Sequence, residues 1–173
     1  LTESGIYTAN GNNYEIDTLI LATGFNADNY LAGIEVVGRE NLKIREYWGS
    51  RPRAYLGITV PQFPNFFMLY GPNTNLAVNG SLLFMIECAV DYVIATLRTM
   101  TELNMHSVDT TEQALEGFVQ LMDTANAERA WGIDSVSNWY KGATGVVTQN
   151  WPLSLASYWH LTQDLEEGAH QFN

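Results

Sequence analysis

Two places in the sequence combine a short apolar run with a glycine that ends it. Residues 19–22 precede Gly24, and residues 65–70 precede Gly71. Continuous apolar runs of this length are typical of strands buried on both faces, as in a parallel sheet. In open α/β sheets, ligands bind beyond the carboxyl ends of such strands, where glycine lets the backbone approach closely. We therefore interpret both glycines as parts of candidate binding sites. The alternative for each is a glycine that only turns the chain.

The second site is followed by a polar segment, residues 73–81, and then by a long apolar stretch. Asn79 and Ser81 are residue types that cap helices. The N-terminus of a helix carries about half a positive charge and favours an anion or a polarised carbonyl group. The segment therefore predicts a helix N-terminus that faces a ligand beyond the strand end. Ordinary capping without a ligand is the alternative.

The elements that must position these sites begin with a predicted hairpin, residues 6–8 and 14–16, around Asn10-Gly11. Its second arm leads into the first buried strand, residues 19–22. Residues 26–64 are mixed and rich in glycine and proline, which favours irregular structure. The second buried strand is residues 65–70, and it stops at the breaker Gly71-Pro72-Asn73.

Three helices are predicted further along the chain. The first spans about residues 80–100 and is apolar except for one narrow polar stripe, which indicates a helix buried on most sides. The second starts near Thr110, where residues 110–113 fit a capping box, and it is amphipathic. A short third helix covers residues 153–162. With no repeat or linker, residues 1–173 are interpreted as a single unit.

Composition narrows the function classes. The chain has 173 residues, 46% hydrophobic and 16% charged, with a net charge of −11. Such an acidic surface repels phosphate backbones and argues against a nucleic-acid partner. The most apolar stretch, residues 82–97, is interrupted by Glu87 and Asp91, which argues against a membrane span. Cys88 is the only cysteine, so a reducing, cytoplasmic location is expected. The histidines lack ligand-like spacing, and no metal site is predicted.

Several segments resemble one enzyme family. Leu21–Phe25 resembles the ATGF segment of flavin-containing and Baeyer–Villiger monooxygenases. Arg53–Pro61 and Phe63–Leu76 are more specific and resemble the Baeyer–Villiger branch, especially members that act on aryl ketones such as hydroxyacetophenones. Asn138–Lys141 and Asn150–Pro152 resemble the tail of the same enzymes. The resemblance covers essentially the whole chain, with the segments in the same order.

The resemblance implies an α/β fold, namely the C-terminal fragment of a FAD-binding Rossmann-like domain. In this family FAD is reduced by NADPH, and one oxygen atom is inserted into a ketone to give an ester or lactone. The implied flavin and nicotinamide contacts are Thr23, Gly24, Phe25, Gly71, Asn73, Asn75, Leu76, Gly80, Ser81 and Trp139. Trp139 matches a tryptophan near the nicotinamide cofactor in relatives; a core position is the alternative.

The chain also departs from the family pattern. Relatives have Leu-Gly-His-Gly-Gly-Ser where this chain has Leu76–Ser81 as Leu-Ala-Val-Asn-Gly-Ser. The G-x-G-x-x-G loops that bind the pyrophosphates of FAD and NADPH are absent. The family's histidine fingerprint and catalytic arginine segment are also absent, so the catalytic residues are unknown. Arg51 and Arg53 lie between the two glycine sites, where a solvated or structural role is favoured over a substrate-side or interface one.

Several alternatives follow from these departures. Leu1 begins within strand-like sequence, so the chain is expected to start inside a longer protein, and the isolated chain is expected to be inactive. The chain could instead be a non-catalytic remnant or interaction module that needs a dimer partner or a complementing N-terminal polypeptide. An enzyme that oxygenates nitrogen or sulfur is a third possibility, because it shares the ATGF segment.

Overall fold

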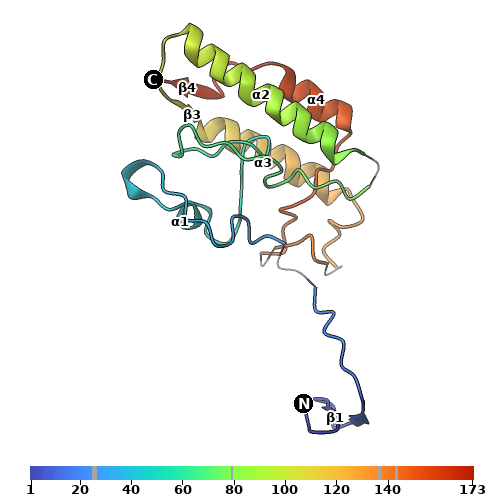
Figure 1. The fold of residues 1–173 in the computed structure, drawn as a ribbon. Helices are drawn as coiled ribbons and strands as arrows, with labels where there is room; N and C mark the ends of the chain where they lie inside the picture. Colours follow the sequence, from blue (N-terminus) through green and yellow to red (C-terminus); the bar gives the residue numbers. More distant parts are fainter. Residues whose placement is uncertain (25–26, 79, 136–137, 143) are drawn as a thin grey trace.

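The computed structural model describes residues 1–24, 27–78, 80–135, 138–142 and 144–173. Figure 1 shows a body of three longer helices and looped segments, with a small hairpin carried away from it on an extended stretch of chain. Phe25 and Asn79, two residues singled out in the sequence, lie outside the described residues.

The N-terminal hairpin is confirmed. Strands β1 (Gly5–Tyr7) and β2 (Asn13–Glu15) pair antiparallel, with Gly5 opposite Glu15. The turn closes through a bond of 2.9 Å from the Gly11 amide to the Thr8 carbonyl. Gly11 has φ of +89°, a conformation that glycine adopts without steric cost.

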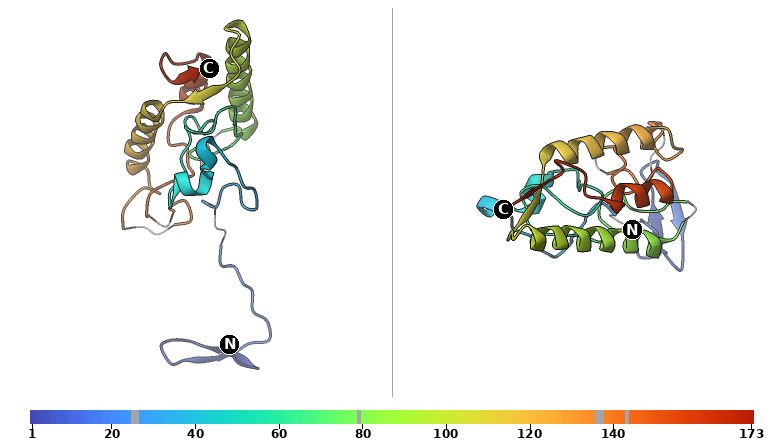
Figure 2. Two further views of the ribbon diagram at one scale, coloured as in Figure 1. Left: turned by 90° about the vertical axis from the view of Figure 1, so that its left-hand side faces the viewer. Right: turned by 90° about the horizontal axis from the view of Figure 1, so that it is seen from above.

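The buried strand expected at residues 19–22 is wrong for this structure. These residues run extended between the hairpin and the body, as the left view of Figure 2 shows, and they belong to no strand. Ile20 is 83% exposed and Leu21 is 75% exposed. The apolar pattern identifies residues suited to burial, but the described residues supply no neighbouring strand to pair with them.

The second expected strand, residues 65–70, is also wrong. Asn65 and Tyr70 both have positive φ, of 59° and 62°, so the chain bends at each end of the segment. Between them the Met68 amide donates to the Ile58 carbonyl at 2.8 Å, and the Met68 side chain is buried. The apolar residues therefore pack into a looped core instead of a sheet.

That looped core belongs to residues 27–70. Irregular structure was predicted for residues 26–64, and the described residues of that range are mostly irregular. They contain the short helices η1 (Arg39–Asn41) and α1 (Ile44–Trp48). Both end residues of α1 are buried. The second hydrophobic cluster of the molecule consists of Ile44, Trp48, Ala54, Val60, Phe63 and Met68.

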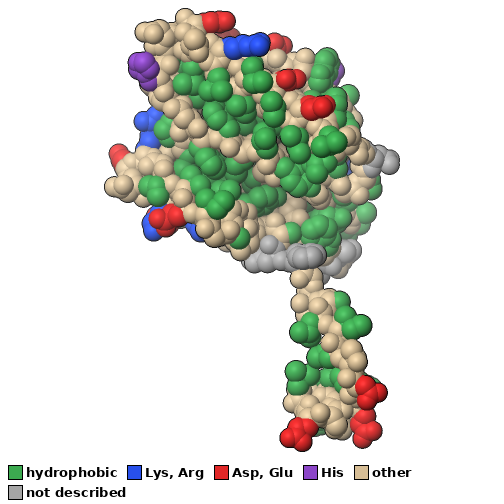
Figure 3. Space-filling view, viewed as in Figure 1, with side chains coloured by type: hydrophobic (Ala, Val, Ile, Leu, Met, Phe, Trp, Pro, Cys, Tyr) green, Lys and Arg blue, Asp and Glu red, His purple; other side chains and the backbone are tan. Residues whose placement is uncertain are grey.

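Helix α2 (Leu82–Glu102) confirms the long predicted helix, and it packs against α4 (Leu155–Gln163), the confirmed short helix. Ser81 and Ser154 cap these helices by accepting from backbone amides in their first turns. The expectation that α2 is buried on most sides is wrong, because Leu83 is 71% exposed and Leu97 is also exposed. Figure 3 shows apolar side chains gathered on this face of the body.

Helix α3 (Glu112–Ala127) confirms the predicted amphipathic helix, and its buried side chains are Leu115, Phe118, Met122 and Asn126. Its cap is Thr111, whose hydroxyl accepts from the Ala114 amide, so the capping box expected at residues 110–113 does not form. Strand β3 (Val108–Thr110) precedes α3 and pairs antiparallel with the C-terminal strand β4 (His170–Phe172). The sequence did not predict this sheet.

The main hydrophobic core lies between α2, α3 and α4. Its buried members include Met85 and Tyr92 of α2, Leu115 and Met122 of α3, and Tyr158 of α4. The described part of the chain is thus a mixed fold with two small antiparallel sheets and one isolated parallel bridge, Asn75 with Asn150. The parallel, Rossmann-like sheet of the expected α/β fold is not formed by the described residues. None of the described helices combines the length and hydropathy needed to cross a bilayer.

Candidate functional site

The candidate site is built where the segment after Gly71 runs beside residues 147–151. The Asn73 amide donates to the Thr148 carbonyl at 2.9 Å, and the Asn75 amide donates to the Gln149 carbonyl at 2.8 Å. In return, the Trp151 amide donates to the Asn75 carbonyl at 2.8 Å. Backbone hydrogen bonds therefore join the loop after Gly71 to the 147–151 segment, which lies about 75 residues further along the chain. These bonds fix the path of the loop.

Asparagine side chains add a second layer of contacts to this junction. Asn75 Nδ2 donates to Asn150 Oδ1 at 2.7 Å. The Asn150 carbonyl accepts from Asn73 Nδ2 at 3.3 Å and from Asn126 Nδ2 at 3.2 Å. Asn126 lies in the last turn of α3, so the loop, the 147–151 segment and this helix are tied at one residue, Asn150.

The tight shape of the loop explains its glycine and asparagine. A Cβ on Gly71 would collide with the carbonyl oxygen of Gly57, so a side chain there would displace the backbone. Asn73 has φ of +61°, in the left-handed region that asparagine tolerates better than most residues. The Thr74 hydroxyl donates to the Gly71 carbonyl at 2.7 Å and closes the turn.

The loop leads from Leu76 to the N-terminus of α2. Leu76 is half-buried and packs against the main core. A Cβ on Gly80 would lie 3.0 Å from Cδ1 of both Leu76 and Leu155, so the chain passes close to α4 here. Ser81 Oγ accepts from the Phe84 amide at 3.3 Å, and the first turn of α2 carries no acidic residue. The positive end of the helix dipole is therefore not neutralised by its own first turn.

Trp139 lies on the surface and not in the core. Its side chain is 51% exposed and packs on Tyr140, with ring centroids 4.5 Å apart. The Trp139 carbonyl accepts from Gln149 Nε2 at 2.8 Å. Gln149 also receives the Asn75 amide at its carbonyl, so this one residue connects Trp139 with the loop.

The first glycine site is less well connected. Thr23 and Gly24 are exposed on the extended stretch, and Phe25 lies outside the described residues. Just beyond them, Asp28 Oδ2 lies 2.7 Å from the position of a Cβ on Gly142. Burial raises the pKa of Tyr30, and the neighbouring Tyr70 raises it further. The chain after Gly24 thus approaches both the 138–148 region and the start of the loop.

The amide side chains of Asn73, Asn75 and Asn126 all donate within the junction, so they shape the loop and are not free donors. The groups left for a ligand are the exposed Trp139 indole and the unneutralised N-terminus of α2, which suit a flat ligand with carbonyl and ring-nitrogen acceptors. Among the described residues, Thr148 Oγ1 and Asn150 Nδ2 are buried and lack hydrogen-bond partners. Buried unpaired groups of this kind are uncommon in folded proteins and concentrate polarity beside the loop.

Arg51 and Arg53 have structural contacts, in agreement with the favoured prediction. Arg51 Nη2 pairs with Asp123 Oδ1 of α3 at 2.5 Å. The Arg53 guanidinium lies over the Tyr47 ring, 5.9 Å from its centroid. Arg51 thus connects the looped core with α3, and Arg53 packs against α1 within the looped core. Within the described ranges no group of histidine, cysteine and acidic side chains has the geometry of a metal site.

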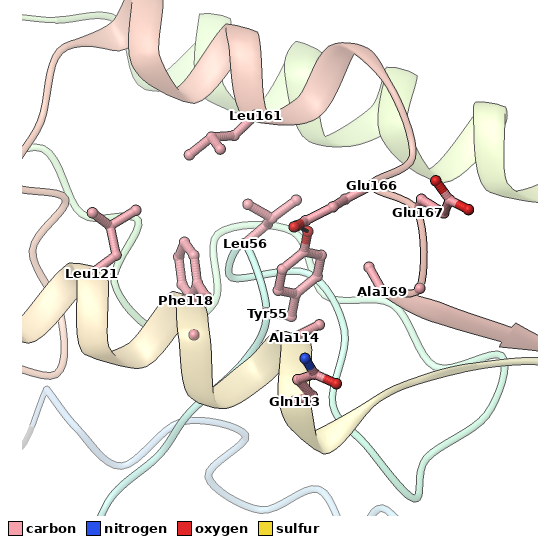
Figure 4. A pocket seen from close by; sticks show the side chains of 12 residues that line it. Tyr55, Leu56, Gln113, Ala114, Phe118, Leu121, Leu161, Glu166, Glu167 and Ala169 are labelled. Atoms are coloured by element: carbon pink, nitrogen blue, oxygen red, sulfur yellow. Dashed lines mark hydrogen bonds between the residues drawn. The ribbon is translucent and has the colours of Figure 1, made fainter.

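A separate cavity of about 590 Å³ lies between α3 and α4, away from the predicted residues (Figure 4). Leu121 and Leu161 face it from the two helices, and the Tyr55 hydroxyl donates to Glu166 Oε2 at 2.8 Å inside it. Burial and this bond raise the pKa of Tyr55. None of the residues predicted to bind a cofactor lines this cavity.

Sequence reasoning identified part of the junction and missed the rest. The structure brings Gly71, Asn73, Asn75 and Leu76 together in one loop, with Trp139 linked to it through Gln149, and their contact with a cofactor stays a prediction. Asn126 and residues 147–149 were not expected there. The one available signal was Asn150–Pro152, which resembles the family tail but carries no motif that assigns a role.

Comparison with known proteins gives a consistent set of relatives. No family profile matches the chain. The chain is 33% identical over 162 residues to an uncharacterized monooxygenase, y4iD, of Sinorhizobium fredii. It is 30% identical over 171 residues to a Baeyer–Villiger monooxygenase of Pseudomonas aeruginosa, and 34% identical over 147 residues to a cyclohexanone 1,2-monooxygenase of an Acinetobacter species. These matches cover 93%, 98% and 83% of the chain.

Solved structures agree with the sequence matches. The closed structure of cyclohexanone monooxygenase superposes with a TM-score of 0.77 at 27% identity and covers 100% of the chain. Oxidized steroid monooxygenase bound to NADP superposes with a TM-score of 0.75 at 29% identity and covers 98%. The chain spans only about a quarter to a third of the length of these relatives: 24%, 32% and 26% of the three proteins, and 33% and 32% of the two structures.

Proposed function

We infer that this chain, a segment of a Baeyer–Villiger-type flavin monooxygenase, supplies one wall of the flavin-ring site in a longer enzyme. The observation that carries the proposal is the junction at residues 147–151. It holds the predicted loop, residues 71–76, and through Gln149 it also holds the exposed Trp139. Names of the relatives support the cofactors, since several are FAD-binding monooxygenases and several of the similar solved structures are bound to NADP.

Residues of this chain would hold the ring edge and the nicotinamide cofactor as follows. The loop from Asn73 to Leu76 and the N-terminus of α2 at Ser81 would face the ring edge that gains negative charge on reduction. Trp139 would lie where the nicotinamide meets the flavin ring and would contact both rings. Thr23 and Gly24 would approach from the first glycine site, where Phe25 is the third proposed contact. When bound, FAD reduced by NADPH supplies the chemistry that inserts one oxygen atom into a ketone.

The chain's own contribution is to position the flavin ring and to exclude water from one of its faces. The backbone bonds at Asn73 and Asn75 leave the loop little freedom, so its polar groups are oriented before a ligand arrives. A ring packed against Trp139 and Leu76 would lose water on one face, which strengthens polar contacts at its edge. No residue described here is assigned as a proton donor or acceptor in the reaction.

The proposed product is an ester or lactone, and the proposed substrate is a ketone of unspecified structure. Loops that bind pyrophosphate are absent from this sequence, so we expect the isolated chain to show no turnover of a ketone with NADPH. We also expect the adenosine half of FAD to add nothing to the affinity of the isolated chain for flavin.

A complementing surface is part of the proposal. Ile20 and Leu21 are exposed in a sequence suited to a buried strand, and burial of such side chains stabilises by roughly 1.5–3 kcal/mol each. We propose that another polypeptide, or a second copy of this chain, covers them. The same observation favours the rival function, an interaction module without catalysis. A rival module of this kind would bind its partner and no flavin.

Equilibrium titration with FMN, FAD and ADP tests the proposal on the chain itself. We expect FMN and FAD to bind with comparable affinity and ADP not to bind, because only the ring site is present. Trp139→Leu should weaken flavin binding, whereas Trp159→Leu, at another exposed tryptophan on α4, should not. Binding of ADP, or flavin binding that is insensitive to Trp139→Leu, would count against the assignment.

A further inference from the structure

Asn150 is fully buried and lies at the centre of the junction. Its side-chain oxygen accepts from Asn75 Nδ2 at 2.7 Å, and its backbone carbonyl accepts from Asn73 and Asn126 side chains. Asn75 in turn accepts the Tyr70 hydroxyl at its Oδ1, at 2.5 Å. A single buried residue thus contacts both asparagines of the loop and the last turn of α3.

The Asn150 side chain forms these contacts while leaving its own amide donor unpaired in the part of the chain that the structure describes. Its Nδ2 is buried and has no partner among the described residues. A buried amide normally pairs both its donor and its acceptor. Here the acceptor is used for Asn75 while the donor is left unpaired. The orientation of the side chain is therefore set by the loop's need for an acceptor and not by the satisfaction of Asn150 itself.

We propose that Asn150 is a positioning residue that sets the shape of the loop from Asn73 to Leu76 and so orients the groups offered to the flavin ring. This inference rests on the proposed function for its consequence, but the positioning is a property of the chain alone. Asn150 itself touches no ligand, because its side chain is enclosed by protein.

The choice of residue follows from what the position requires. An apolar side chain of similar volume, such as leucine, would leave Asn75 Nδ2 without its acceptor. Aspartate keeps an acceptor in the same place. Thr148 offers a matched control, since it is equally buried beside Asn150 and its hydroxyl has no partner among the described residues. Removing that hydroxyl breaks no bond in the junction.

Amide hydrogen exchange of the whole chain, followed by NMR, tests the positioning. The reporters are the amides of Asn73, Asn75 and Trp151, which bond across the junction, and the reference is the amides of α2 and the first turns of α3. In Asn150→Leu we expect exchange at the reporters to rise about tenfold or more relative to the reference, given the penalty for an unpaired buried donor. Asn150→Asp should restore part of the protection, and Thr148→Val should exchange like the unaltered chain.

Asn75→Ala removes the same bond from its partly exposed end and keeps the test valid if Asn150→Leu does not fold. It should loosen the same reporters. Unchanged reporters in both variants, or equal acceleration throughout α2 and α3, would overturn the positioning role. FMN titration then separates the two proposals. If FMN binds the unaltered chain, Asn150→Leu should weaken it. If FMN does not bind, the proposed function fails while the exchange data still decide the positioning.

Discussion

At the scale of single residues, His170 joins three elements of the body. Tyr92 of α2 lies 2.6 Å from its Nε2, and the Thr110 hydroxyl of β3 lies 3.2 Å from its Nδ1. Thr110 also donates to the Thr59 hydroxyl at 2.6 Å, so the looped core is part of the same network. Burial lowers the pKa of His170, and the nearby Asp109 opposes this shift only in part.

The lowered pKa predicts how stability depends on pH. A histidine whose pKa is lower in the folded state binds more protons when unfolded, where its pKa is about 6.5. Its contribution to stability is therefore complete above that pH and is lost as the pH falls toward the folded pKa. We expect His170→Gln to reduce the loss of unfolding free energy between neutral pH and about pH 5, measured by urea denaturation.

His160→Gln on α4 controls for the removal of an imidazole as such, because that side chain is exposed. The interpretation would be contradicted if His170→Gln followed the unaltered chain at every pH, or if His160→Gln flattened the profile to the same degree.

Residue types at the junction were partly predictable from sequence. Gly71, Asn73 and Asn75 were found because a glycine after an apolar run is a local pattern. Asn126 and Asn150 were not, since their roles depend on partners far along the chain that no local pattern specifies. The pattern identified a loop that the structure fixes at the junction, but the preceding residues form a bent core segment and not the predicted strand.

At the scale of elements, the helices and the N-terminal hairpin were predicted well, and the other strands poorly. The helices α2, α3 and α4 have caps and apolar periodicity contained within their own sequences. The two expected parallel strands needed neighbours that the described residues do not supply. Strands β3 and β4 pair across about 60 residues in three-residue segments, too short for alternation to be recognised.

Two leucines on α3 test the core assignment. Leu115 is fully buried between α2 and α4, whereas Leu121 faces the cavity and is 42% exposed. Leu115→Ala should cost about 2–5 kcal/mol of unfolding free energy because it leaves a void. Leu121→Ala should cost less than about 1 kcal/mol, since it removes little buried surface. Equal costs in chemical denaturation would show that the core does not lie where we describe it.

The cap of α3 gives a second test at this scale. Thr111 Oγ1 accepts from the Ala114 amide at 3.2 Å and donates to the Gly168 carbonyl at 3.1 Å, just before β4. Thr111→Ala should lower the unfolding free energy by about 1 kcal/mol or more. Thr124→Ala, within the same helix, should be close to neutral because alanine is the better helix former. A neutral Thr111→Ala in thermal denaturation would exclude the capping role.

At the scale of the whole molecule, apolar side chains are exposed in several regions of the described chain. Two of these regions are the extended segment around Ile20 and Leu21 and the outer face of α2 around Leu83 and Leu97. The N-terminal hairpin stands away from the body in Figure 1 and in the left view of Figure 2. Exposed apolar surface of this kind favours association with another polypeptide. The relatives are about three to four times longer than this chain, so they contain further polypeptide that has no counterpart here.

Charged substitutions in the extended segment test that association. Ile20→Asp combined with Leu21→Asp should leave the unfolding free energy of the body unchanged, because neither side chain is buried in it. The same variant should reduce self-association measured by sedimentation velocity. A large loss of stability would show that this segment packs against the body in solution, contrary to the structure.

We propose that the loop from Asn73 to Leu76, the N-terminus of α2 and Trp139 form one wall of a flavin-ring site. The most direct measurement is an NMR titration of the chain with FMN, following each backbone amide and the tryptophan indoles. We expect chemical-shift changes concentrated at the amides of Asn73–Leu76 and Ser81 and at the Trp139 indole. Shifts confined to the cavity between α3 and α4, or no shifts at any FMN concentration, would contradict it.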